Sequence, residues 1–273
     1  MCITITPLGT VSPYPKNNKN CPGFLIESNN NKVLLDCGSG ISRLLDMKKD
    51  LNNLIIIISH LHKDHYSDLA SIAYASYIYH KLGHLNERIK TYIPKADTYE
   101  TSLYSTDKDG WGISIPTTKN IMDYEYLMNF GKENYLNFIT YDTREKLTHG
   151  DMNITFSQNP HPLNTFCCKI SNKENTIVYS SDTGFKKNSL VSFAKDVDLL
   201  ICESTYLKGQ LKEEDNHLYA YEAANIAKLA NVKKLLLTHF WPEIDKDEYV
   251  NEAKEIFENT EAAVEEKKLI LRR

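Results

Sequence analysis

Four side chains that can bind a metal ion fall within six residues, directly behind an apolar run. The segment reads His60-Leu61-His62-Lys63-Asp64-His65 and follows an aliphatic stretch over 54–58. Alternate residues of an extended segment share one face, so His60 and His62 can point at one metal ion. The chain then turns, which leaves Asp64 and His65 for a second ion. Imidazole and carboxylate are ligands that zinc prefers. A polar loop is the alternative, and the position directly behind an apolar strand favours a metal site.

Three later residues are candidates for completing a two-metal site, which needs roughly seven or eight ligating positions with one group bridging. Each follows an apolar strand pattern and precedes a turn; they are His161, Asp182 and His239. Loops at sheet edges are where such sites assemble. Alone, His161 also fits a surface loop, His239 a core position and Asp182 a turn. Their joint occurrence behind the first motif favours ligands.

The elements that must position these residues are mostly strands. Apolar or alternating patterns predict strands over 3–8, 23–27, 32–36, 54–58, 153–157, 165–170, 176–180, 198–202 and 234–238. Helices are predicted over 39–45, capped by Ser39, and over 69–82, 219–230 and 247–258. The unbroken run at 54–58 is typical of a strand covered on both faces. Strands alternating with helices predict an α/β fold with two mixed β-sheets packed face to face and helices outside, a four-layer αββα sandwich.

Domain organisation is predicted to be simple. The chain has 273 residues with no internal repeat, low-complexity tract or Pro/Gly/Ser linker, which predicts one domain over 1–273. An aromatic-rich insert at about 93–135 interrupts it, and we expect short helices and a mobile loop over roughly 94–141.

The overall composition and charge limit the kinds of partner that we expect for this protein. The net charge of −4 provides no global basic field for nucleic acid. The N-terminus lacks a signal-peptide layout, and no apolar run approaches the roughly 20 residues that span a bilayer. The six cysteines have no framework spacing, which predicts free thiols. We therefore expect a cytoplasmic protein with no membrane partner.

Over essentially its whole length the chain resembles the metallo-β-lactamase-fold hydrolases. That family carries H-x-H-x-D-H, then a lone histidine, a bridging aspartate and a final histidine in this order. The resemblance implies two Zn²⁺ per chain, with Mn²⁺ as the other candidate. It assigns one ion to His60, His62, His161 and Asp182, and the other to Asp64, His65, Asp182 and His239.

Within that family, a second set of residues resembles the ribonuclease Z-like branch. The segment Cys202-Glu203-Ser204-Thr205-Tyr206 is followed by His217 and then by Glu222-Ala223-Ala224. In that branch the acidic residue and the histidine complete a phosphodiesterase site. The resemblance implies that Asp64 orients the nucleophile or accepts its proton, that His217 protonates the leaving oxygen and that Glu203 holds the His217 tautomer. A strand-end carboxylate and a polar residue at a helix start are the ordinary alternatives for Glu203 and His217.

One departure from that branch concerns the substrate. Ribonuclease Z enzymes that mature tRNA carry a long arm where this chain has only residues 171–175 between two predicted strands. The missing arm and the negative charge argue against a large structured RNA. Residues 9–15 and 20–23 look similar to arm-less phage anti-Pycsar phosphodiesterases, which act on cyclic mononucleotides.

This resemblance implies a dinuclear zinc-dependent phosphodiesterase that hydrolyses small, 3′,5′-cyclic nucleotides by attack of a metal-bridging hydroxide, in the service of immune evasion. It also implies a homodimer whose insert forms a lid. Tyr99, Tyr104 and Trp111 would then stack on a base, or pack the insert against the body or a partner. A tRNA 3′-end processing endonuclease and a non-catalytic nucleotide-binding sponge are the alternatives.

Overall fold

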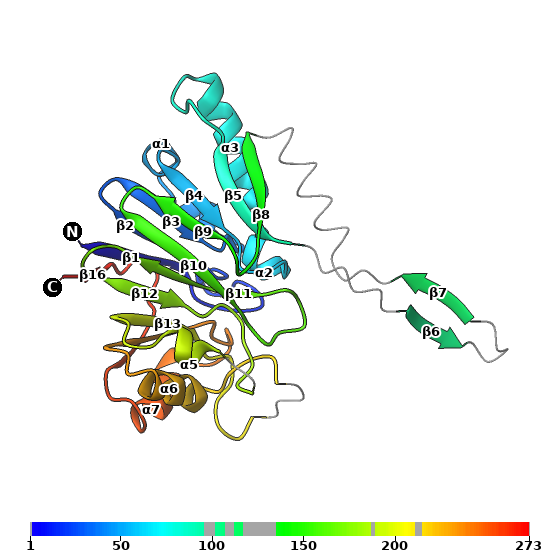
Figure 1. Cartoon of the computed structure of the whole chain (residues 1–273), viewed down its shortest axis with the longest axis vertical. Coiled ribbons are helices and arrows are strands. Elements are labelled where there is room, and N and C mark those ends of the chain that lie inside the picture. The colour runs from blue at the N-terminus through cyan, green and yellow to red at the C-terminus, as the bar shows by residue number, and fades with distance from the viewer. Residues whose placement is uncertain are drawn as a thin grey trace.

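Two mixed β-sheets pack face to face, with helices on both outer faces (Figure 1). The computed structural model describes residues 2–95, 135–186, 189–210 and 215–272, together with the backbone of 102–106 and 112–116. The first sheet has the order β16-β1-β2-β3-β4-β5-β8. Its strands are β1 (Ile3–Gly9), β2 (Gly23–Ser28), β3 (Asn31–Leu35), β4 (Leu54–Ile57), β5 (Ile89–Pro94), β8 (Leu136–Tyr141) and β16 (Leu269–Leu271).

The second sheet has the order β15-β14-β13-β12-β11-β10-β9. Its strands are β9 (Lys146–His149), β10 (Met152–Gln158), β11 (Phe166–Ser171), β12 (Thr176–Tyr179), β13 (Leu199–Glu203), β14 (Leu235–Thr238) and β15 (Thr260–Ala262). The helices within the described residues are η1 (Ile41–Leu44), α1 (Met47–Asp50), α2 (Lys63–Tyr66), α3 (Leu69–Lys81), α5 (Leu190–Phe193), α6 (Ala220–Leu229) and α7 (Lys246–Lys254).

Three apolar clusters among the described residues hold the four layers together. A single strand can contribute side chains to two of these clusters. Along β4, Ile55 and Ile57 face the cluster between the sheets, whereas Ile56 faces the cluster beneath α3. Successive side chains of a strand point to opposite faces, so an unbroken aliphatic strand suits a sheet covered on both sides. Cys168 and Cys167 divide in the same way between the central cluster and the cluster beneath α6 and α7. The αββα sandwich predicted from the sequence is confirmed.

Parallel pairing brings the chemistry-bearing loops to one edge. In the first sheet β3 pairs parallel with β4, and in the second β12, β13 and β14 pair parallel in series. The carboxyl ends of parallel neighbours lie at the same edge. The residues that follow β4, β12 and β14 are therefore gathered there, and β13 ends there with Glu203.

One prediction about local structure, the helix cap at Ser39, is wrong. Ser39 does not cap a helix: Gly40 stands at the N-terminal end of η1 at a φ of 97°, with no side-chain cap. The free amides of Gly40 and Ser42 are instead bound by the Asp68 carboxylate, which arrives from another part of the chain. In the insert, β6 (Ser102–Thr106) and β7 (Gly112–Pro116) form an antiparallel pair. The short helices and the mobile loop predicted for this region stay predictions for its remaining residues. Residues 96–101, 107–111 and 117–134 lie outside the described part, as do the side chains of Tyr99, Tyr104 and Trp111.

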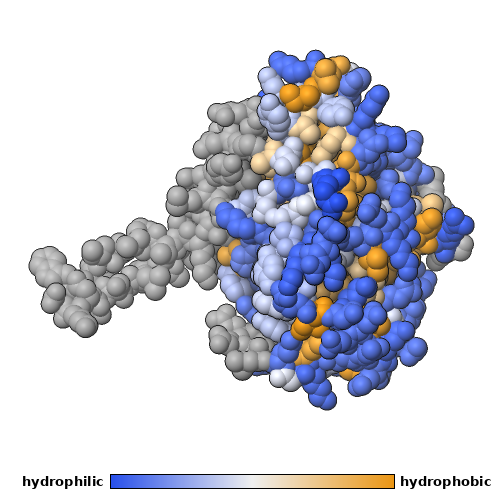
Figure 2. Space-filling view, turned by 180° about the vertical axis from the view of Figure 1, so that it is seen from behind, coloured by the Kyte–Doolittle hydropathy of each residue, from blue (hydrophilic) through white to orange (hydrophobic). Residues whose placement is uncertain are grey.

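The surface carries no dominant apolar region on the face drawn in Figure 2, where hydrophilic side chains prevail and hydrophobic ones form small separate patches. The six cysteines are free thiols, as predicted. Among the helices that the structure describes, none is both long enough and apolar enough to cross a membrane.

Candidate metal centre

The residues predicted as ligands converge at the edge of the sandwich in two groups. His60, His62, His161 and Asp182 form one group, in which all ligand atoms lie within 4.8 Å of one another. Asp64, His65 and His239 form the other under the same limit. These are the two sets that the resemblance assigns to two ions, except that Asp182 is counted only in the first.

Asp182 nevertheless faces both groups, one carboxylate oxygen to each. Its Oδ2 lies 3.5 Å from His60 Nε2, whereas its Oδ1 lies 3.3 Å from His65 Nε2 and 3.1 Å from His239 Nε2. Asp64 Oδ2 lies 3.6 Å from His65 Nε2 and 3.8 Å from His239 Nε2. A carboxylate that turns one oxygen to each group has the geometry of a bridging ligand.

Asp36, directly after β3, orients two of these histidines from outside the cluster. The Nδ1–H of His65 donates to Asp36 Oδ2 at 2.8 Å. Ser59 Oγ donates to the same carboxylate at 2.9 Å, so it accepts from His60 Nδ1 at 3.1 Å. Tyr179 OH is a further donor to Asp36 at 2.7 Å. Both imidazoles therefore direct Nε2 inwards, the nitrogen that is left to coordinate a metal.

Glu203, at the end of β13, likewise orients two histidines, His217 and His239. Its Oε1 accepts from His217 Nδ1 at 3.0 Å, and its Oε2 accepts from Thr205 Oγ1 at 2.9 Å. Because the Thr205 hydroxyl donates there, it accepts from His239 Nδ1 at 2.8 Å. One buried carboxylate thus holds His217 directly and His239 through a hydroxyl, which repeats the pattern of Asp36 and Ser59.

The donor set suits two borderline cations. In a tetrahedral zinc site with bonds near 2.0–2.1 Å, neighbouring ligand atoms lie roughly 3.3 Å apart. The Nδ1 of His62 lies 2.9 Å from His60 Nε2 and 3.3 Å from His161 Nε2. The Nδ1–H of His161 donates to Asn216 O, which leaves its Nε2 as an acceptor. Acceptor nitrogens this close to one another repel unless a proton or a cation lies between them.

Three buried polar atoms that lack hydrogen-bond partners also indicate a metal site. His65 Nε2, His239 Nε2 and Asp182 Oδ1 are buried and make no hydrogen bond. Burying polar atoms unsatisfied costs about 1–3 kcal/mol each, and these three face one another, so a shared cation would satisfy all of them.

The protonation states also fit metal binding. Burial lowers the pKa of His161 to about 4 and lowers the pKa values of His60, His62 and His239. His65 differs: burial lowers its pKa, but Asp182, Asp64 and Asp36 outweigh that and raise it well above its usual range. A metal ion at Nε2 must displace this proton, which couples binding to proton release.

The pKa of His217 is shifted in the opposite direction from that of most of the ligand histidines. Burial lowers its pKa, but Glu203 and Asp182 outweigh burial and raise the pKa to about 9. Burial raises the pKa of Glu203, but His217 outweighs it and holds that carboxyl below its usual range. His217 is therefore protonated at neutral pH while Glu203 is ionised. His217 also forms a third possible metal group with Asp182 and His239.

Sequence reasoning missed the roles of Asp36, Ser59, Thr205 and Ser12. Ser12 Oγ donates to Asp64 Oδ2 at 2.8 Å and so orients that carboxylate. One signal was available for Asp36, because it follows an apolar strand in the same way as Asp182 and His239. The three hydroxyls had no signal, since each of them contacts at least one site residue that lies far away in the sequence.

Replacing Asp36 with asparagine is expected to weaken metal binding by about 10–100-fold. Asparagine keeps the shape but removes the charge that orients His65 directly and His60 through Ser59. Metal titration against a competing chelator measures the affinity. Ser59→Ala, which cuts only the link to His60, is expected to have a smaller effect. Unchanged affinity in Asp36→Asn would show that the carboxylate does not support the site.

Adding Zn²⁺ or Mn²⁺ to chelator-treated protein is expected to raise its melting temperature by about 5–10 °C. A ligand at 100 times its Kd stabilises the native state by about 2.7 kcal/mol, and each kcal/mol shifts Tm by about 2–4 °C at this size. Scanning fluorimetry measures the shift. Mg²⁺, which prefers oxygen ligands, serves as the control and should shift Tm less. Equal shifts for all three ions would speak against a histidine-rich site.

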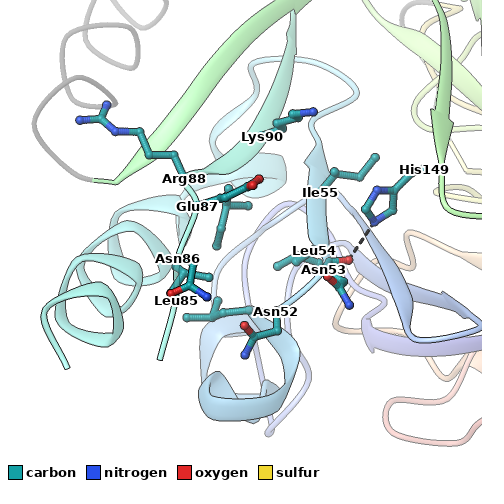
Figure 3. A pocket seen from close by; sticks show the side chains of 12 residues that line it. Asn52, Asn53, Leu54, Ile55, Leu85, Asn86, Glu87, Arg88, Lys90 and His149 are labelled. Carbon is teal, nitrogen blue, oxygen red and sulfur yellow. Dashed lines mark hydrogen bonds between the residues drawn. The ribbon is translucent and has the colours of Figure 1, made fainter. Parts of the chain in front are cut away.

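A separate hollow of about 410 Å³ lies at the other end of the first sheet (Figure 3). It is lined by Leu54, where β4 begins, whereas His60 follows the end of that strand. His149 Nε2 donates to Asn53 O at 2.8 Å across its wall, and the Arg88 side chain extends away from the other labelled residues. None of the nine predicted site residues lines it, so it is distinct from the metal centre.

The whole chain is similar to known metallo-hydrolases. It is 28% identical over 256 residues to the probable metallo-hydrolase YhfI of Bacillus subtilis, covering 93% of each chain. The crystal structure of YhfI matches with a TM-score of 0.80 at 25% identity, over 98% of this chain and 99% of that one. Ribonuclease Z of Archaeoglobus fulgidus is 28% identical over 304 residues, covering 95% of each. The short form of human tRNase Z matches with a TM-score of 0.69 at 18% identity, over 97% of this chain and 98% of that one.

The fold, the histidine and aspartate groups and these relatives define a metal-dependent hydrolase of the metallo-β-lactamase fold, in its ribonuclease Z-like branch. Within that class, the model of the Anti-Pycsar protein Apyc1 family matches residues 3–262. The chain belongs to this family.

Proposed function

We propose that this chain is a dinuclear zinc phosphodiesterase that hydrolyses small 3′,5′-cyclic nucleotides. The observation that carries the proposal is the pair Glu203–His217 beside the ligand groups. His217 Nδ1 lies 3.0 Å from Glu203 Oε1 and 3.9 Å from Asp182 Oδ2. A protonated histidine next to the bridging carboxylate suits phosphoester cleavage, because a leaving oxygen there needs a proton.

The chain's own residues divide the work. The two groups around Asp182 would hold two metal ions, which when bound would supply Lewis acidity and a nucleophilic water at neutral pH. Asp64, oriented by Ser12, accepts the proton of the attacking water. His217 donates its proton to the departing sugar oxygen as the phosphorus–oxygen bond of the cyclic ester breaks. Glu203 keeps the proton-bearing Nδ1 of His217 outside the reaction and so aims its Nε2 at the substrate.

The short turn between β11 and β12 supports a small substrate. Residues 172–175 connect the two strands, and Asn172 N donates to Asn175 O at 2.9 Å. The Asn172 side chain closes the turn further by accepting from the amides of Glu174 and Asn175. No room is left at this point for an arm that grips tRNA.

The same proposal extends to the setting of the enzyme. We propose zinc as the resident metal, with manganese as the alternative. We further propose a cytoplasmic homodimer of single-domain subunits, which evades immunity by degrading cyclic nucleotide messengers. Membership of the Anti-Pycsar protein Apyc1 family supports this setting.

The test incubates the purified protein with 3′,5′-cyclic mononucleotides and with bis-(p-nitrophenyl) phosphate, in the presence of zinc or manganese. We expect chelator-sensitive turnover of at least one cyclic nucleotide and of the nitrophenyl ester. No metal-dependent turnover of either would refute a phosphodiesterase.

Two other functions are decided by parallel assays. Cleavage of precursor tRNA at low enzyme concentration would establish a tRNA 3′-end processing endonuclease. Stoichiometric binding of a cyclic nucleotide without product would establish a nucleotide-binding sponge. The complete set of ligand residues favours an enzyme over the sponge.

A further inference from the structure

A seam of two chain segments leads outwards from the metal centre. Ser12 N donates to Phe240 O at 3.0 Å, and Phe240 N donates to Thr10 O at 2.9 Å. The first segment contacts Asp64 through Ser12, and the second supplies His239. Both segments therefore begin at the second ligand group and leave it side by side.

The seam ends in an open pair of aromatic rings. Tyr14 and Trp241 each stand two residues beyond the site residue of their own segment. Two residues span at most roughly 7 Å of chain. The ring centroids of Tyr14 and Trp241 lie 5.9 Å apart at an interplanar angle of 75°. The two residues are 40% and 38% exposed, so the contact between the rings leaves aromatic surface open to solvent.

The position of Tyr14 is set by a charged neighbour. Tyr14 OH donates to Glu243 Oε1 at 3.0 Å, and the Lys16 ammonium binds the other oxygen of the same carboxylate. On the second segment, Trp241 N donates to Tyr249 OH at 3.3 Å. The Tyr14 side chain and the Trp241 backbone are thus held in place, which lowers the ordering cost when a ligand binds.

The tyrosines on the other side of the site differ. Tyr206, Tyr219 and Tyr221 run outwards from His217, but they pack on one another at centroid distances of 5.7 and 5.3 Å. Tyr219 OH also donates to Gln210 O. Mutual packing gives these rings a structural role, whereas Tyr14 and Trp241 keep open surface beside the ligand groups.

We propose that Tyr14 and Trp241 form a platform on which the base of the nucleotide substrate stacks, with Trp241 as the main contact. This inference rests on the proposed phosphodiesterase function and assigns its specificity for substrates that carry a base. A nucleotide held by its phosphate at the metal centre projects its base outwards, and every base has a π-face that an aromatic ring can stack on. The platform is made of residues outside the insert, so it acts together with any lid or without one.

Trp241→Ala is expected to raise the KM for a 3′,5′-cyclic nucleotide by roughly 10-fold or more, with kcat within a factor of about three. Trp241→Phe should restore most of the affinity, and Tyr14→Ala should have a smaller effect. The matched control is Tyr74→Ala, an aromatic residue on α3 that is 62% exposed and should leave KM unchanged. Ribose 3′,5′-cyclic phosphate, which lacks a base, should show the same KM with wild type and Trp241→Ala.

The possible outcomes distinguish a failure of the stacking proposal from a failure of the proposed function. If wild type cleaves cyclic nucleotides and Trp241→Ala keeps the wild-type KM, the platform is refuted and the proposed function stands. If wild type cleaves none, the proposed function falls and the platform falls with it. An equal rise of KM for the base-free phosphate, or a change of oligomer mass by light scattering in Trp241→Ala, would assign Trp241 to packing and refute stacking.

Discussion

Replacing Asp182 with asparagine is expected to remove both metal ions from the protein and to lower kcat/KM by at least about 10³-fold. The carboxylate turns Oδ2 towards His60 and Oδ1 towards His65 and His239, so each group loses a charged ligand. The amide also presents an NH₂ donor to histidine nitrogens that are expected to coordinate metal. This effect should exceed the 10–100-fold typical of an outer partner such as Asp36.

Metal content by plasma mass spectrometry, measured with activity, tests this prediction. Asp198→Asn is the matched control, because Asp198 accepts from Thr176 N at 2.7 Å but directly precedes β13, at the end of that strand opposite to Glu203 and the metal centre. It should keep two ions per chain and wild-type activity. Two ions retained in Asp182→Asn would contradict a bridging role.

Replacing His217 with alanine is expected to reduce turnover by about 10²-fold or more while leaving the metal content unchanged. His217 can also form a metal group with Asp182 and His239, so the metal content decides between the two roles. Loss of one ion together with activity would identify His217 as a ligand. His149→Ala is the control, since His149 donates its Nε2–H to Asn53 O outside the site.

The leaving group sharpens the test of His217. A nitrophenolate departs without help from an acid, whereas the alkoxide of a sugar needs a proton. The loss on His217→Ala should therefore be large for a cyclic nucleotide and small for bis-(p-nitrophenyl) phosphate. Equal losses on both substrates would assign His217 to charge stabilisation and not to proton transfer.

The dependence of the rate on pH is an independent test of His217 as the proton donor. Glu203 and Asp182, against the effect of burial, raise the pKa of His217 to about 9. An acid must be protonated, which holds below this pKa and fails above it. The rate with a cyclic nucleotide should therefore fall as the pH rises through about 9, and His217→Ala should lose this limb of the profile.

Much of the fold was predictable because its strands are buried on both faces. The aliphatic run at β4 and the short apolar segments at β12, β13 and β14 are regular over the length of a strand, and local composition suffices to identify them. β5, β8, β9, β15 and β16 were missed. β9 is a short edge strand, and β15 and β16 contain three residues each, too few for a pattern. The helix end at Gly40 was wrong because its cap, Asp68, comes from a distant part of the chain.

The candidate site was also predictable only in part. Residue types and order alone made the seven ligand positions candidates, because imidazoles and carboxylates directly after apolar strands are chemically unusual. The pair Glu203–His217 was expected only from the resemblance to the ribonuclease Z-like branch. Which atom each residue presents was not predictable. The hydroxyls of Ser59 and Thr205 decide that His60 and His239 turn Nε2 inwards. Ser59 depends on the distant carboxylate of Asp36, and Thr205 links Glu203 to the distant His239.

By itself, the sequence determined the class of fold, the chemistry of the ligands and their order along the chain, since these depend on residue types and short-range periodicity. Only the tertiary structure decided the distances around Asp182, the charge state of His217 and the meeting of Tyr14 with Trp241. Those depend on parallel strand pairing and on burial, which bring residues far apart in the chain to one edge of the sandwich and remove water from between them.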